Sequence, residues 1–269
     1  MSKKRVLNVT STKKRNGMLP YSNTTSAGLT RALAPGIAVV NGRDGGTFLW
    51  LATAQDLSAS GSTNTVAQAA ARTATTCFMR GLKEGLTVQT STSIPWTHRR
   101  ICFTFRGLNP FINVTPPDSP VVTYSPYVET SNGMQRLWLN QNINGMTASR
   151  NQIEGFIFKG SSGVDWNDVI VAPLDTSRIS VKFDKAWTYH SGNANGVYKK
   201  RDLWHPMNHN LVYDDDEVGA AEQASYVSVN SKAGMGDYYV LDYFAPGYGA
   251  TVNDLLAVSN NSTLYWHEK

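Results

Sequence analysis

The side chains best suited to catalysis or metal binding, five histidines and two cysteines, follow no pattern that supports such chemistry. His205 and His209 have the four-residue spacing of a zinc-binding helix, but Pro206 follows the first histidine and no glutamate lies between them. The sequence also lacks a His-x-His pair, a Gly-x-Ser-x-Gly elbow and a Gly-x-x-x-x-Gly-Lys-Ser/Thr phosphate loop. We therefore expect no catalytic residue, metal site or cofactor, and we predict that the protein is not an enzyme.

The strongest chemical signal is a basic N-terminal end. Six of the first fifteen residues are Lys or Arg, and no acidic residue precedes Asp44, whereas the rest of the chain has 19 Lys and Arg against 20 Asp and Glu. A dense cationic segment binds a phosphate backbone because each contact releases condensed counterions. This end predicts nucleic-acid binding, with a nuclear import signal or a solubilising tail as alternatives. Its predicted DNA-binding residues are Lys3, Lys4, Arg5, Lys13, Lys14 and Arg15.

A second basic group lies far along the chain. Lys199, Lys200 and Arg201 are followed closely by Trp204. Single-strand binders combine phosphate-pairing charge with a stacking plane in this way. We therefore include these four residues among the predicted DNA contacts. The alternative is an ordinary exposed turn beside a core tryptophan.

The densest acidic run is Asp214-Asp215-Asp216-Glu217. Its carboxylates could supply oxygen ligands to a divalent cation. Neighbouring side chains of a strand point to opposite faces, however, so adjacent carboxylates do not converge there. A solvated loop or a charged rim at a subunit contact is the better interpretation of this run.

Composition and pattern favour an all-β fold. Charged residues are 17% of the 269 and aromatic residues 10%, and no apolar run approaches the roughly 18 residues of a membrane span. Eight or more short strands separated by turn-rich loops predict a single antiparallel jelly-roll β-sandwich with about eight main strands and long loops. We assign residues 1–46 to a basic arm with an extended connector and residues 47–269 to the jelly-roll domain.

The individual elements follow from apolar alternation and from glycine and proline positions. Five prolines between Pro110 and Pro126 predict a long surface loop. Only residues 251–258 have a helical pattern, with Thr251 and Asp254 resembling a capping box. The predicted strands include residues 47–54, 75–90, 99–106, 155–159, 168–172, 179–189 and 238–244.

Four stretches, taken together and in this order, resemble a known family. The chain is similar to the capsid proteins of genomoviruses, small circular single-stranded DNA viruses, and most similar to the fungal, hypovirulence-associated members. None of the four motifs is catalytic. They are Lys4 to Thr10 (KRVLNVT), Cys77 to Glu84 (CFMRGLKE), Pro95 to Thr104 (PWTHRRICFT) and Lys200 to Asn208 (KRDLWHPMN).

This resemblance implies a structural role. About 60 copies would form a small icosahedral (T=1-like) shell around circular single-stranded DNA, with the basic arm facing the interior. The protein would be located in the virion and, during assembly, in the host nucleus, where host import machinery is a second partner and no membrane is involved. Family members usually carry a longer arginine-rich arm, so we expect the full-length protein to be more basic at its N-terminus. The alternative function is a lectin-like jelly-roll module that binds carbohydrate.

Overall fold

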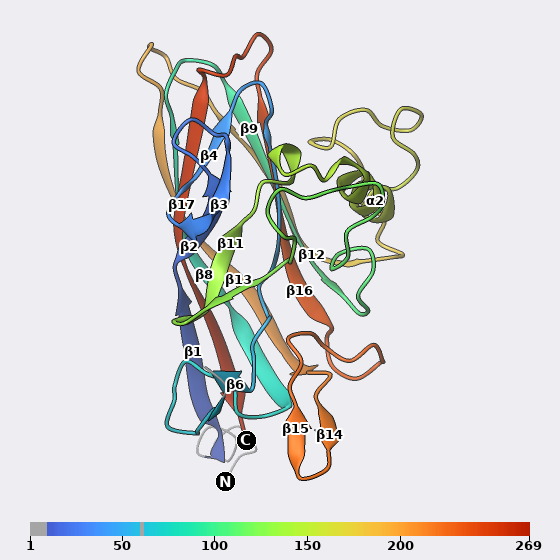
Figure 1. Cartoon of the computed structure of the whole chain (residues 1–269). Helices are drawn as coiled ribbons and strands as arrows, with labels where there is room; N and C mark the ends of the chain where they lie inside the picture. Colours follow the sequence, from blue (N-terminus) through green and yellow to red (C-terminus); the bar gives the residue numbers. More distant parts are fainter. Residues whose placement is uncertain (1–9, 60–61) are drawn as a thin grey trace.

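Two antiparallel β-sheets packed face to face form the body of the protein (Figure 1). The computed structural model describes residues 10–59 and 62–269. In the first sheet the order is β1-β17-β8-β13, and β4 pairs with β17 beyond the end of β1. The second sheet has the order β12-β9-β16-β5. The all-β, antiparallel architecture predicted from the sequence is therefore confirmed.

The strands of the first sheet are β1 (Thr12–Met18), β4 (Ala38–Asn41), β8 (Thr76–Thr90), β13 (Tyr198–Val212) and β17 (Leu255–Glu268). Those of the second are β5 (Gly46–Leu51), β9 (Trp96–Phe105), β12 (Ser180–Tyr189) and β16 (Asp237–Pro246). Two small antiparallel hairpins lie outside these sheets: β6 (Ser58–Ala59) pairs with β7 (Ser62–Thr63), and β14 (Asp216–Val218) pairs with β15 (Ala221–Gln223).

A third, four-stranded sheet lies beside the two main ones. It consists of β2 (Pro20–Thr24), β3 (Thr30–Pro35), β10 (Val128–Thr130) and β11 (Gly133–Trp138). Together with β1 and β4, this sheet replaces the extended connector that we predicted for residues 16–46. The prediction was wrong because β1 and β2 contain few apolar residues and bury polar ones instead. Asn23, for example, accepts a hydrogen bond from the backbone of Asn140 at 2.8 Å.

Within the second sheet β5, β9 and β16 are buried on both faces, which explains why β5 and β16 have nearly continuous apolar sequences. Its outer face is covered by α2 (Thr147–Ile157), which follows the short 3-10 helix η1 (Gln141–Ile143). Ile153 and Ile157 of α2 pack in one cluster with Phe103 and Tyr239 of the sheet. The side chain of Asp118 accepts hydrogen bonds from two backbone N–H groups in the first turn of α2.

Three local predictions were wrong. Residues 155–159 form the end of α2 and the segment after it, and residues 168–172 form no strand. Residues 251–258 are not helical, because β17 begins at Leu255 and pairs with β8. The contact predicted within them does form, since the backbone N–H of Thr251 donates to Asp254 Oδ2 at 2.7 Å, but it closes only a turn.

A fully buried ion cluster joins the sheets. Arg100 of β9 and Arg136 of β11 lie between Glu84 of β8 and Asp242 of β16, and all four side chains have no exposed surface. Arg100 Nε lies 2.7 Å and Arg136 Nη2 lies 2.9 Å from the carboxylate of Asp242. Arg136 Nε lies 3.2 Å from Glu84, and Arg100 also pairs with it. His98 is hydrogen-bonded to Asp242 at 2.7 Å.

The pKa values of this cluster follow from its pairing. Burial alone would raise the pKa of Glu84, but Arg100 and Arg136 hold it at about 2. The same arginines and His98 keep the pKa of Asp242 far below its ordinary value against the effect of burial. Both carboxylates are therefore ionised at neutral pH, and their two negative charges balance those of the two arginines.

We predict that Glu84→Gln destabilises the protein strongly. The variant keeps the size of the side chain but leaves Arg100 and Arg136 with too little buried negative charge, a type of change that costs about 3–5 kcal/mol. Urea unfolding followed by circular dichroism measures this loss. Glu217→Gln, in the exposed β14–β15 hairpin, is the control and should leave the unfolding midpoint unchanged. Equal midpoints for the two variants would contradict a structural role for the cluster.

Stability should also fall in acid. As the pH drops below the ordinary Glu value of 4.5, the unfolded chain takes up a proton that folded Glu84 does not accept until about pH 2. The free energy of unfolding therefore decreases as the pH falls through this window. Urea midpoints at about pH 6 and about pH 3 measure the effect. The decrease should be smaller in Glu84→Gln than in the wild type, and an identical decrease would contradict the assignment.

Candidate nucleic-acid interface

The outward face of the first sheet gathers cations and aromatic rings from all four of its long strands. Alternate residues of a strand point to the same face, so the register decides which side chains meet. On this face β1 places Lys13 and Arg15, β17 places Tyr265 and His267, β8 places Phe78, Arg80 and Lys83, and β13 places Lys200 and Trp204. We call these nine residues the basic-aromatic face.

Cross-strand pairing puts each of three cations beside a ring. Lys13 lies opposite His267, which in turn lies opposite Phe78. Arg15 lies opposite Tyr265. Lys83 lies opposite Trp204. Directly opposed residues have Cβ atoms about 4.5–5.5 Å apart, so charge and ring lie within reach of one bound nucleotide.

Trp204 is held in place while half of its surface stays exposed (50%). Its indole lies over Gly81 of β8, where a Cβ atom would come within 2.7 Å of Trp204 Cζ2 and 2.6 Å of the His205 carbonyl oxygen. Gly81 also has φ +152°, which other residues rarely adopt. The ring of Tyr265 lies 6.0 Å away between centroids. These contacts hold the indole in one position at the surface, where a base could stack on it.

A shallow depression of about 370 Å³ lies at the centre of this face. Arg80 at its edge donates to Asn208 Oδ1 at 2.7 Å, and Asn208 adopts a left-handed backbone (φ 54°) at a bulge of β13. Burial, with Arg80 and Lys13 nearby, lowers the pKa of His267, so its imidazole is neutral at pH 7. The lining contains no carboxylate; it consists of Lys13, Lys14, Arg80, Lys83, Trp204, Tyr265, Trp266 and His267.

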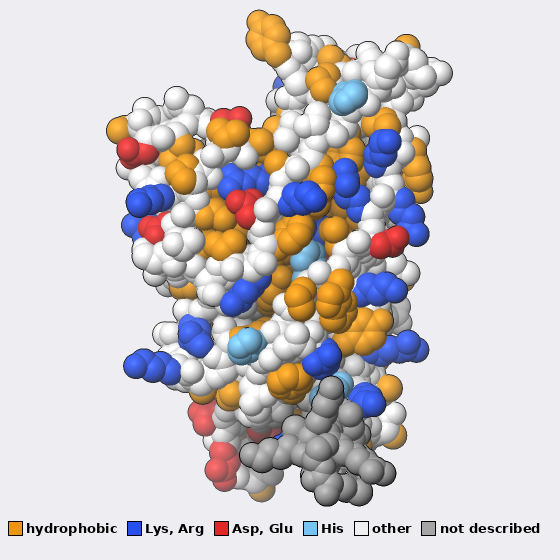
Figure 2. Space-filling view, turned by 180° about the vertical axis from the view of Figure 1, so that it is seen from behind, with side chains coloured by type: hydrophobic (Ala, Val, Ile, Leu, Met, Phe, Trp, Pro, Cys, Tyr) orange, Lys and Arg blue, Asp and Glu red, His pale blue; other side chains and the backbone are white. Residues whose placement is uncertain are grey.

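The basic-aromatic face carries a large excess of positive charge. Asp202 is the one carboxylate among the outward-pointing residues of β1, β17, β8 and β13 as the structure describes them, and it lies 3.4 Å from Lys200. Figure 2 views the molecule from behind, and its right-hand half carries many Lys and Arg side chains among exposed hydrophobic ones. Such a surface attracts polyanions and offers them rings to stack on.

The structure brings together parts of both predicted basic groups, but not all of them. Lys13, Arg15, Lys200 and Trp204 share the basic-aromatic face, whereas Lys3, Lys4 and Arg5 lie outside the described residues. Lys14 does not face outward. Its ammonium donates to Ala71 O at 2.8 Å and Gln68 O at 3.2 Å, and it lies 3.4 Å from the carboxylate of Glu268, fully buried. Lys14 is therefore a structural residue, and its buried position does not agree with the DNA contact that we predicted for it.

Lys199 and Arg201 do not belong to the basic-aromatic face, although we predicted them as DNA contacts together with Lys200. Alternate residues of β13 point to opposite faces of the sheet, so these two side chains point away from Lys200. Arg201 lies over the ring of Trp187 (4.8 Å) and its Nε donates to the Tyr189 hydroxyl at 3.2 Å. It thus bridges β13 to β12 across the edge between the two main sheets. The basic triplet is split between two surfaces, and only Lys200 belongs to the basic-aromatic face.

Sequence reasoning missed Arg80, Lys83, Tyr265 and His267. Simple alternation along residues 75–90 would place Phe78 and Arg80 on one face and Lys83 on the other. The irregular step at Gly81, where β8 changes register against both neighbours, brings Lys83 to the same face. The glycine was recognisable as a bulge signal, but its effect on the direction of Lys83 was not.

Other chemistry finds no support in the described chain. Within residues 10–59 and 62–269, no three His, Cys, Asp or Glu side chains gather as a metal site, and no helix is long and apolar enough to cross a membrane. Cys102 lies 3.8 Å from His205. Burial raises the pKa of Cys102 to about 12 and lowers that of His205 to about 4, so neither is charged at neutral pH. A protonated thiol of this kind is a poor nucleophile.

Comparison with known proteins adds no identification: no protein-family model matches the sequence, and no curated protein is significantly similar to it.

The contrast between the two neighbouring lysines of β1 can be tested. Lys14→Met should lower the free energy of unfolding by about 3–5 kcal/mol, because it leaves Glu268 and two carbonyl groups without their buried partner. Lys13→Met, one residue away and exposed, should leave stability unchanged. Thermal and urea unfolding of the two variants measure the difference. A stable Lys14→Met variant would show that its contacts are dispensable.

Proposed function

We propose that this chain is the capsid protein of a small single-stranded DNA virus of the genomovirus type. In this proposal its copies assemble into a closed icosahedral (T=1-like) shell of about 60 subunits and enclose circular single-stranded DNA. The basic-aromatic face and the basic residues Lys3, Lys4 and Arg5 contact the DNA. Assembly takes place in the host nucleus, with the N-terminal cluster as import signal, and the virion is the final location.

The strand order supports a jelly-roll assignment. Eight strands of the two main sheets, apart from β1, can be counted in chain order as β4, β5, β8, β9, β12, β13, β16 and β17. The order in the first sheet, β4-β17-β8-β13, corresponds to the first, eighth, third and sixth of these strands. The order in the second sheet, β5-β16-β9-β12, corresponds to the second, seventh, fourth and fifth. Two four-stranded antiparallel sheets with such interleaving are typical of the jelly roll, a fold used by viral capsids and by lectins.

The observation that carries the function is the basic-aromatic face itself. It has five exposed cations on β1, β8 and β13, next to Trp204 and to Tyr265 of β17, and its central depression contains no carboxylate. Phosphates pair with the cations at any sequence, and unpaired bases stack on the rings. A duplex keeps its bases inside, so the rings favour a single strand. Packaging of a whole genome requires such sequence-tolerant binding.

The carbohydrate-binding alternative has weaker support. Neutral sugars gain little from a row of cations, yet each exposed ring on this face lies beside a cation or a histidine. A second pocket, near β3 and β4 and lined by residues such as Arg31 and Ile37, has hydroxyl groups but no aromatic side chain in its lining. Neither surface therefore combines an aromatic platform with neutral hydrogen-bonding groups.

Assembly is the first test of this proposal. The full chain, purified and examined by electron microscopy and sedimentation, should form uniform particles that protect DNA from nuclease. A persistent monomer that is retained on a glycan column would overturn the capsid proposal and favour the lectin-like alternative.

Binding of an oligothymidine should separate charge from stacking. Lys83→Gln should reduce the slope of log K against log salt by about 0.7, because one phosphate contact is lost. Trp204→Ala should weaken binding by about 1–3 kcal/mol at every salt concentration and leave the slope unchanged, because stacking releases no counterions. Lys182→Gln, on β12 of the second sheet, is the matched control. Equal behaviour of the Lys83 and Lys182 variants would exclude the basic-aromatic face as the binding surface.

A further inference from the structure

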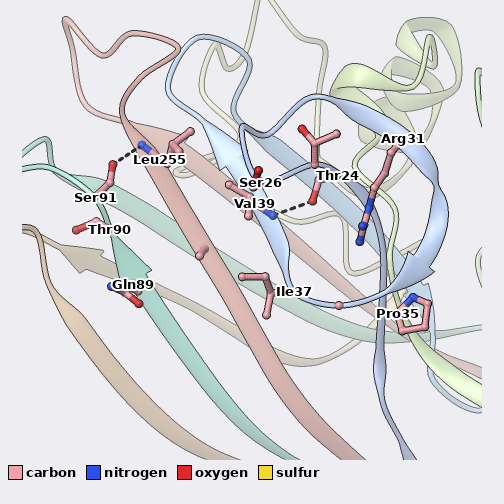
Figure 3. A pocket seen from close by; sticks show the side chains of 13 residues that line it. Thr24, Ser26, Arg31, Pro35, Ile37, Val39, Gln89, Thr90, Ser91 and Leu255 are labelled. Carbon is pink, nitrogen blue, oxygen red and sulfur yellow. Dashed lines mark hydrogen bonds between the residues drawn. The ribbon is translucent and has the colours of Figure 1, made fainter.

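A second pocket, of about 480 Å³, lies away from the basic-aromatic face (Figure 3). It is bordered by the segment from β2 to β4, the end of β8 and the start of β17. Its walls are largely apolar, from Pro35, Ile37, Leu255 and Ala257, with hydroxyl groups of Thr and Ser residues between them. Ile37 keeps 45% of its surface exposed, which is a large apolar exposure for a residue at the mouth of a pocket.

Arg31 gives this pocket an unmatched donor. Its Nε is buried and has no hydrogen-bond partner among the described residues. The guanidinium lies beside Gly36, where a Cβ atom would come within 3.3 Å of Arg31 Nη2. No carboxylate belongs to the lining. An occupant that is mostly apolar and carries an acceptor or a π face would therefore complement the pocket.

Tyr248 is the most exposed large hydrophobic side chain among the described residues (107%). It lies in the loop between β16 and β17, flanked by Gly247 and Gly249. The base of the loop is fixed, because the Gly247 N–H donates to the Pro95 carbonyl oxygen at 2.7 Å. The ring itself has no aromatic or cation–π contact within the described chain. A tyrosine held out in this way has a large area to bury against a partner.

We propose that Tyr248 of one copy inserts into the Arg31 pocket of a neighbouring copy. The ring would lie against the guanidinium in a cation–π contact, and its edge would pack on Ile37 and Leu255. Tyrosine and arginine are the residue types that most often dominate protein interfaces. This inference rests on the proposed function, because it names one contact between subunits of the shell.

The positions of the two features suit a ring of subunits. Figure 1 shows the β16–β17 loop at the upper end of the molecule and β3 and β4 in its upper half. The projection and the pocket are different surfaces, and a contact of this kind that repeats head to tail closes into a ring when the rotation between copies allows it. The symmetry axis of this ring would pass near the upper end.

Tyr248→Ala and Arg31→Ala test the contact in the full chain. Each should raise the protein concentration needed for half-maximal assembly about tenfold or more, and the double variant should be no worse than either single one, because both remove the same contact. Tyr248→Phe should keep most of the assembly. Val164→Ala, at an exposed apolar position (83%) after α2 and outside the pocket lining, is the control, and unfolding curves verify that every variant is folded. Wild-type assembly by Tyr248→Ala, or fully additive effects, would overturn the proposal.

A photo-crosslinking side chain at position 248 identifies the partner directly. In assembled particles, a cross-link to a peptide containing residues 31–37 or Leu255 supports the contact, whereas one to the acidic β14–β15 hairpin or to any other segment outside the pocket lining overturns it. If the wild-type chain forms particles and these tests fail, only this contact is wrong. If the wild-type chain forms no particles, the capsid proposal fails and this contact fails with it.

Discussion

The pairing of two arginines with two carboxylates in the interior constrains the whole molecule. Glu84, Arg100, Arg136 and Asp242 come from β8, β9, β11 and β16, so three sheets must be in the correct register before any of these charges is neutralised. A shift of one residue in β8 would turn Glu84 to solvent and leave two arginines buried without it, which is far more costly than the loss of an apolar contact. The same constraint reaches the surface. Because Glu84 must point inward, its neighbour Lys83 must point outward, and the basic-aromatic face depends on that choice.

The sequence allowed the fold class and the most regular strands to be predicted. Alternation along residues 99–106 and the apolar run of 238–244 correspond to β9 and β16, whose side chains form the core. The elements that were missed depend on partners far away in the chain. Helix α2 has few strong helix formers, and the carboxylate that caps its first turn comes from Asp118 in the proline-rich loop. Strands β1 and β2 are polar and owe their stability to their neighbours β17 and β11.

The candidate site was predictable only in part, for a related reason. Charge density along the chain pointed to two basic segments, but it could not show that β17 and β8 lie between them. Lys14 and Arg201 have the same local sequence character as the exposed cations beside them. Their different positions are set by Glu268 and by Tyr189, which alternation within one strand cannot reveal. Composition thus predicts that a surface is cationic, and tertiary packing decides which cations belong to it.

The position of β17 links the folding of this protein to its synthesis on the ribosome. This strand lies inside the first sheet, with β8 on one side and both β1 and β4 on the other. β1 and β4 therefore have no partner in this sheet until residues 255–268 have been synthesised, although β8 and β13 can already pair with each other. A chain that ended before that point would leave β1, and the lysine and arginine that it presents, detached from β8. The two halves of the cationic surface are thus joined only when β17 takes its place between them.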